Sequence, residues 1–99
     1  MQEEYDVFLL TKPPFNPRSE LCLKLAVRSR NARLYLAGDG IYHLLSGIQK
    51  FPGCTVYACQ KDLEARAISG REKVIIPGNF YAVFIEDMMM ENCKRAYTF

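Results

Sequence analysis

The sequence predicts an α/β fold, namely a three-layer α/β/α sandwich around a mainly parallel sheet of about five strands. Short apolar runs of strand length alternate with segments in which apolar residues recur at helical spacing. Proline, glycine or asparagine separates most of these segments. Such alternation is typical of βαβ units, whose right-handed crossovers place helices on both faces of a parallel sheet.

The first strand is expected at residues 7–10, a continuous apolar run that Pro13 and Pro14 follow. Asn16 and Pro17 are the residue types favoured at an N-cap and at the first helical position, so a helix is expected from there to about residue 30. Its apolar stripe is predicted to comprise Leu21, Cys22, Leu25, Ala26 and Val27.

The second strand is expected at residues 34–37, and Gly38 closes it. Asp39 is predicted to cap the helix that follows. One side of this helix is expected to carry Ile41, Leu44, Leu45 and Ile48.

The third strand is expected at residues 55–58, and a short helix at residues 60–67. Leu63 and Ala67 are predicted to share the buried face of that helix. Ser69 and Gly70 are expected to end this segment before the fourth strand.

The fourth strand is expected at residues 73–76 and the last strand at residues 96–99. Between them Asn79 is predicted to cap a helix. The buried side of this helix is expected to comprise Phe80, Val83, Phe84 and Met88. Residues 88–90 are three consecutive methionines, so at least one must leave the buried face and serve another contact, such as a subunit interface.

Length and composition indicate one globular domain over residues 1–99, with 49% hydrophobic and 24% charged residues. The net charge of +2 is too small to predict direct binding of nucleic acid. No apolar stretch approaches the roughly 20 residues that span a bilayer, and the first residues lack the basic character of a signal peptide. We therefore expect a cytoplasmic protein that is not bound to membranes.

The cysteines predict free thiols rather than a metal site or a disulfide framework, and no cofactor is expected. They are Cys22, Cys54, Cys59 and Cys93. No two form a C-x-x-C pair, and His43, the single histidine, is expected to be structural. Cys54 and Cys59 are expected on opposite faces of the sheet because five residues separate them. Residues 38–40 lack the third glycine of a dinucleotide loop, so a turn is the preferred interpretation.

Cys59 is the leading candidate for a reactive group because it ends a strand directly before a helix. Functional groups of open α/β sheets lie at the carboxyl ends of strands, and unpaired N–H groups at a helix start stabilise a thiolate. Lys61, Arg66 and Asp39 are predicted to support the thiol site. Lys61 and Arg66 could stabilise the thiolate, whereas Asp62 and Glu64 would oppose it. The alternative is a packed core thiol, since free cysteines are among the most buried residues.

Several motifs together resemble the DsrE/DsrF/DsrH superfamily, most closely its DsrH/TusB branch. They are Lys12-Pro13-Pro14-Phe15, Cys22-Leu23-Lys24-Leu25-Ala26, Asp39-Gly40-Ile41-Tyr42, and Val56-Tyr57-Ala58 followed by Asp62-Leu63-Glu64-Ala65-Arg66. The resemblance implies a sulfur-relay protein in a cytosolic homo- or hetero-oligomer. Its implied partners are sister DsrE/DsrF- or TusC/TusD-like subunits and a small sulfur-carrier protein, in tRNA 2-thiouridine formation or in dissimilatory sulfur oxidation.

The resemblance also assigns roles to individual residues. Cys22 is similar to the helix-one cysteine of DsrH proteins, which makes it a second candidate for the reactive thiol. Cys59 stands where DsrE and TusD subunits carry their sulfur-accepting cysteine. Arg66 matches the arginine at the end of the following helix, but Ala67 replaces the usual glycine, so the helix end is expected to shift to Ser69-Gly70. The alternative function is a non-catalytic subunit that supplies contact surface while a sister subunit holds the reactive thiol.

Overall fold

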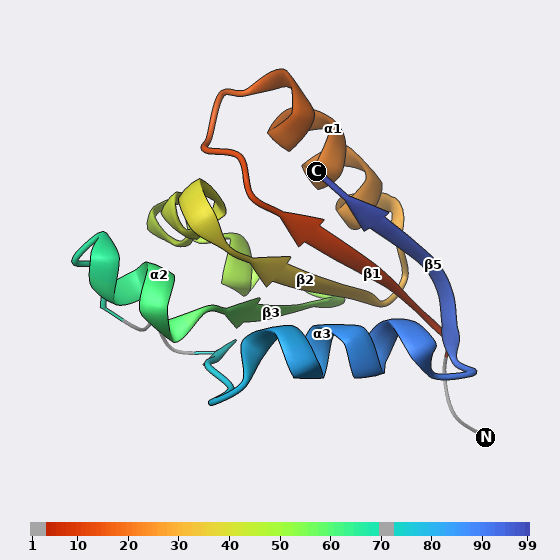
Figure 1. Cartoon of the computed structure of the whole chain (residues 1–99). Helices are drawn as coiled ribbons and strands as arrows, with labels where there is room; N and C mark the ends of the chain where they lie inside the picture. Colours follow the sequence, from red (N-terminus) through yellow and green to blue (C-terminus); the bar gives the residue numbers. More distant parts are fainter. Residues whose placement is uncertain (1–3, 70–72) are drawn as a thin grey trace.

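The computed structural model describes residues 4–69 and 73–99, in which five strands form one all-parallel sheet in the order β4-β3-β2-β1-β5 (Figure 1). The strands are β1 (Tyr5–Leu10), β2 (Ala32–Leu36), β3 (Cys54–Ala58), β4 (Val74–Ile75) and β5 (Cys93–Thr98). The helical elements are α1 (Pro17–Arg28), η1 (Gly38–Ser46), η2 (Ile48–Lys50), α2 (Gln60–Ala65) and α3 (Phe80–Met89). The predicted α/β sandwich is confirmed.

The helical elements cover the two faces of the sheet unequally. Figure 1 shows α3 running beneath the sheet, whereas α1 and the 3₁₀ segments lie on the other face. The strand order explains this division: β1 to β4 advance in one direction, and the chain then returns past them to place β5 beside β1. A right-handed connection in the reverse direction must cross the opposite face.

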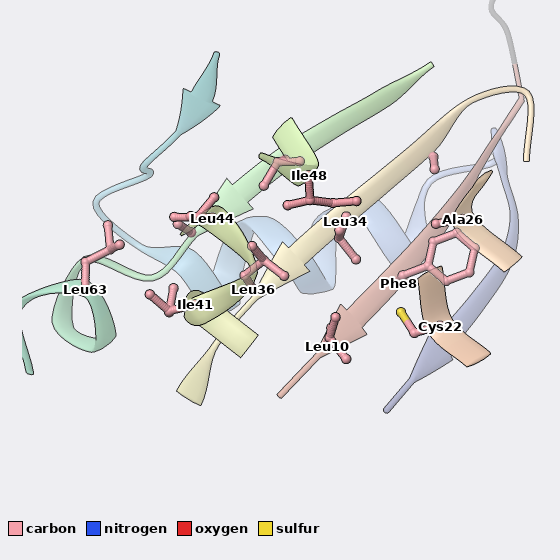
Figure 2. Close-up of a cluster of buried hydrophobic side chains, with 13 residues drawn as sticks. Phe8, Leu10, Cys22, Ala26, Leu34, Leu36, Ile41, Leu44, Ile48 and Leu63 are labelled. Carbon is pink, nitrogen blue, oxygen red and sulfur yellow. The ribbon is translucent and has the colours of Figure 1, made fainter. Parts of the chain in front are cut away.

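Alternation along the strands divides the buried side chains into two cores. In β1, Phe8 and Leu10 face the core beneath α1 and η1, while Tyr5 and Val7 face the core beneath α3. Figure 2 shows the first core, in which side chains from α1, η1 and three strands meet. The second core is smaller and more aromatic, because one helix alone covers it.

The segment after β2 differs from the predicted α-helix, since it forms a 3₁₀-helix (η1) and a second short 3₁₀ turn. Asp39 was expected to cap it, but this prediction was wrong: the N-cap position is Ala37, and Asp39 lies inside η1. Gly40 explains the local shape, because a Cβ there would lie 2.0 Å from the Leu10 carbonyl oxygen. The glycine therefore permits η1 to press against the end of β1.

The predicted buried face of two helices requires correction. On α1, Leu21 and Val27 are exposed, and the buried line comprises Ser19, Cys22 and Ala26. Leu45 on η1 is likewise exposed. The small side chains of Ser19, Cys22 and Ala26 permit close approach of α1 to the sheet. The hydrophobicity of the residues alone did not reveal that the smaller ones would face the sheet.

Several element ends also differ from the prediction. The helix expected at residues 60–67 ends at Ala65, because Ala67 itself adopts a left-handed φ of 53°. Ala67 is thus exposed rather than buried beside Leu63, and the predicted shift of the helix end to Ser69-Gly70 was wrong, although Gly70 lies outside the described residues. The fourth strand is shorter than expected, and β5 begins earlier, at Cys93.

Other local predictions are confirmed. Asn16 accepts a hydrogen bond from the Arg18 N–H at 2.9 Å, and Pro17 begins α1. The four residues predicted for the buried side of α3 all pack into the second core. Met89 is 79% exposed and Met90 is also exposed, as the run of three methionines required.

Candidate functional site

The chain adds β2 to β4 on one side of β1 and then β5 on the other side, so the order of the strands reverses between β1 and β5. Open α/β folds commonly bind ligands at such a point. Here the carboxyl ends of these two strands are joined directly. Thr11 donates to the Phe99 carbonyl oxygen from its backbone N–H at 2.9 Å and from Oγ1 at 2.8 Å. Cys59 lies two strands away, at the carboxyl end of β3.

Cys59 occupies the N-cap position of α2 and is 8% exposed. Its backbone N–H donates to the Leu36 carbonyl oxygen at 3.2 Å, and its own carbonyl oxygen accepts the Leu63 N–H at 3.0 Å. The side chain belongs to the aromatic core beneath α3, which includes Phe80 and Phe84. The sulfur therefore lies between the start of α2 and an apolar layer that limits access of water.

A polar network fastens α2 to η1 beside this cysteine. Asp62 accepts the Gly38 N–H at 2.8 Å, and Asp39 Oδ1 accepts from Arg66 Nη2 at 2.9 Å and Nε at 3.1 Å. Arg66 also lies 3.6 Å from Asp62. Arg66 and Asp39 were predicted to support the thiol directly, but the structure pairs them with each other, so their main effect is to position α2.

Lys61 was the other predicted support for the thiol. It is exposed on α2, and no carboxylate of the described residues pairs with it. A lysine in this position adds positive charge to the surface around the start of α2, and water and salt weaken its effect. No contact between Lys61 and Cys59 supports a more specific role.

Tyr81, in the first turn of α3, is a site residue that the sequence did not reveal. Burial raises the pKa of Tyr81, and negative charge on Asp62 and Cys59 raises it further. The phenol therefore interacts electrostatically with the carboxylate and the thiol, although the three groups come from two helices and a strand end. A phenol that stays protonated can donate a hydrogen bond to a sulfur anion.

The remaining cysteines lie in environments that disfavour thiolates. Cys22 is fully buried in the first core, as Figure 2 shows, and burial together with the nearby Cys54 raises its pKa to about 12. Burial raises the pKa of Cys54 to about 11 and also raises that of Cys93. Cys22 and Cys54 pack on one face of the sheet and Cys59 on the other, which confirms the predicted separation of Cys54 and Cys59.

His43 is buried and has a structural contact. Its Nε2 lies 3.1 Å from the Lys12 carbonyl oxygen, to which Ser19 Oγ also donates at 2.9 Å. Burial lowers the pKa of His43, so the neutral ring is favoured. The histidine therefore fastens the loop between β1 and α1. Within residues 4–69 and 73–99, no group of three or more His, Cys, Asp or Glu side chains is arranged for a metal ion.

A second polar cluster joins α3 to the sheet, and it was not predicted from the sequence either. Asp87 accepts hydrogen bonds from the Tyr35 hydroxyl and from Arg33 Nη1, the latter at 2.8 Å. The Tyr5 hydroxyl donates to the Asp87 carbonyl oxygen at 2.7 Å, and the Arg33 guanidinium lies over the Tyr5 ring. The sequence contained one signal for this cluster. Asp87 follows Phe84 by three residues, which places a carboxylate on an otherwise apolar helix face where it needs a partner.

Comparison with known proteins gave no match to a family model or to a curated protein. None of the helices in the described part of the chain has the length and apolar character needed to cross a membrane.

Proposed function

We propose that this protein is a sulfur-relay subunit that carries persulfide sulfur on Cys59 within a cytoplasmic complex. The observation that carries the proposal is the location of Cys59 at a strand end, at the N-cap of α2 and against the aromatic core beneath α3. The pKa values of the other three cysteine thiols are raised by burial. The resemblance to sulfur-relay proteins at the same position adds to this support.

The reaction requires no redox partner. The Cys59 thiolate attacks the outer sulfur of a donor persulfide, which forms a new sulfur–sulfur bond at Cys59 and releases the donor as a thiolate. An acceptor thiolate then attacks the outer sulfur on Cys59, takes that sulfur and restores the Cys59 thiolate. The apolar layer around Phe80 and Phe84 limits loss of the persulfide to water.

Intact-protein mass spectrometry after incubation with a low-molecular-weight persulfide tests this proposal. The wild type should gain the mass of one sulfur atom, and Cys59→Ser should not. Cys93→Ser is the control, because Cys93 is more accessible than Cys59 but lies at the other end of the sheet. Absence of the added mass in the wild type, or its persistence in Cys59→Ser, would contradict the proposal.

A second candidate function is a non-catalytic subunit, and the outer face of α3 favours it. Tyr81, Ile85 and Met89 recur at intervals of four residues and are all exposed. A helix that is apolar on both its inner and outer sides is normally covered, here by a sister DsrE/DsrF- or TusC/TusD-like subunit. This function predicts an inert Cys59, whose alkylation rate would rise only near pH 8.5 or above, or not at all.

A further inference from the structure

A cavity of about 790 Å³ lies at the amino ends of β1 and β5, beside the C-terminal end of α1. Its volume is that of a small-molecule site. The cavity exists because α1 packs on β1 and β2, whereas β5 is an edge strand beyond them. Cys59 lies at the opposite, carboxyl edge of the sheet, so the cavity is separate from the candidate thiol site.

Positive charge is concentrated in this cavity. Its basic lining residues are Arg28, Arg30, Lys94 and Arg95, all of them exposed. No carboxylate of residues 4–69 and 73–99 lies within 4.0 Å of any of these four side chains. Glu4 and Asp6 also line the cavity, which leaves a local excess of positive charge. Guanidinium groups without protein partners favour phosphate, which they can bind through two parallel hydrogen bonds.

The floor of the cavity is aromatic. Phe8 of β1 and Tyr97 of β5 lie side by side, with ring centroids 5.2 Å apart and an angle of 18° between the ring planes. Tyr97 is only half-buried, because its strand is at the edge of the sheet. Aromatic rings beside a basic surface are the usual platform on which the bases of nucleotides stack.

An acidic side chain, Asp6, is among the lining residues of the cavity. Asp6 Oδ2 accepts a hydrogen bond from Ser29 Oγ at 2.7 Å, but its Oδ1 is buried and has no hydrogen-bond partner among the described residues. A carboxylate oxygen can accept more than one hydrogen bond. A ribose hydroxyl can therefore donate to Asp6 Oδ2 beside Ser29, as at acidic residues in other nucleotide sites.

We propose that this cavity binds a nucleotide. The phosphate lies against Arg28 and Arg95, the base stacks on Tyr97, and a ribose hydroxyl donates to Asp6. A free mononucleotide and a nucleotide unit of single-stranded RNA present the same chemistry. The site does not depend on Cys59, so either proposal can fail without the other.

Isothermal titration calorimetry of the full chain with AMP, 2′,3′-dideoxy-AMP and inorganic phosphate tests the assignment. AMP should bind more tightly than either of the other two ligands. The double variant Arg28→Gln/Arg95→Gln should lower the affinity for AMP about tenfold or more, since it removes two charged contacts. Lys24→Gln should leave the affinity unchanged, because Lys24 is an exposed cation of α1 that does not line the cavity.

A single-stranded oligoribonucleotide distinguishes the two sources of the ligand. If the site serves RNA, the oligonucleotide should bind more tightly than AMP, and the double variant should reduce the salt dependence of binding. If it serves a free nucleotide, AMP should bind at least as tightly as the oligonucleotide.

Three results would overturn the proposal: no binding of AMP or RNA, equal affinity for AMP and inorganic phosphate, or the same loss in Lys24→Gln as in the double variant. Equal affinity for AMP and its dideoxy form would overturn the role of Asp6. If the double variant fails to fold, Lys94→Gln takes its place. Lys94 is exposed, so its substitution should not disturb folding, and it lines the cavity, so its loss should weaken the binding of AMP.

Discussion

Asp87→Ala tests the polar cluster that joins α3 to the sheet. Asp87 is 15% exposed in its side chain and accepts hydrogen bonds from Tyr35, which is fully buried, and from Arg33, whose side chain is 32% exposed. Removal of the carboxylate leaves the Tyr35 hydroxyl without its charged acceptor, at a cost of about 1–3 kcal/mol. Loss of the partly exposed ion pair adds about 1 kcal/mol at most.

The free energy of unfolding should therefore fall by about 1–4 kcal/mol, a large part of the roughly 5–15 kcal/mol that stabilises a typical domain. Urea unfolding followed by circular dichroism measures this change directly. For a domain of this length, the same change lowers Tm by at least roughly 4 °C. Asp87→Asn should cost less, because the amide oxygen can still accept from Tyr35.

Glu86→Ala is the matched control, since Glu86 is the exposed neighbour of Asp87 on the same helix. It should change the free energy of unfolding by no more than about 0.5 kcal/mol. In a double-mutant cycle with Tyr35→Phe, the losses should be non-additive by about 1 kcal/mol or more. A loss in Asp87→Ala no greater than in Glu86→Ala, or fully additive losses in the cycle, would refute the reasoning.

Three further measurements test other parts of the structure. Gly40→Ala should destabilise the protein by more than about 2 kcal/mol in urea unfolding, because its Cβ would meet the Leu10 carbonyl oxygen at 2.0 Å. Gly78→Ala, whose Cβ would meet nothing within 4 Å, should not; equal losses would contradict the proposed close approach. Burial lowers the pKa of His43 from 6.5, so below that pH the unfolded chain binds a proton that the folded chain resists. Stability should fall from about pH 7.5 to about pH 5.5, and His43→Gln should reduce that slope; an unchanged slope in the variant would show that His43 is not its source. Because burial raises the pKa of Cys22 to about 12, iodoacetamide should label Cys22 more slowly than Cys93 in the native protein, and all cysteines should react in denaturant. Rapid native labelling of Cys22 would contradict its placement in the core.

Local sequence patterns determined the class of fold and several of its details. Apolar runs and breakers predicted the number of strands and their positions along the chain, and the Asn16-Pro17 pair predicted the start of α1. The pattern from Phe80 to Met88 predicted the buried face of α3. These features depend on residues within one or two turns of each other, so a single sequence contains them.

Predictions of which helix face is buried succeeded less well where the choice depended on a neighbouring element. Leu21 and Val27 are apolar but exposed, because α1 approaches the sheet through Ser19, Cys22 and Ala26. The distance between helix and sheet decides such a contact, and the size of the facing side chains sets that distance. Composition along one helix does not specify it.

The candidate thiol was predicted from the sequence, but its surroundings were not. The end of β3 identified Cys59, whereas Tyr81 joins the site only because α3 crosses the opposite face of the sheet. Arg66 was expected to support the thiolate because it lies near Cys59 in the sequence, but in the folded protein it pairs with Asp39. Pairing among charged groups depends on three-dimensional distances that sequence spacing does not give.

The basic cavity depends most strongly on tertiary structure. The whole chain has a net charge of only +2, which predicted no binding of nucleic acid. The placement of β5 beside β1 brings Arg95 to the end of α1, where Arg28 and Arg30 lie. Sequence by itself determined the number and kinds of charges in this protein. Only the strand order, which long-range packing decides, determined that four of the cations meet in one cavity without carboxylate partners among the described residues.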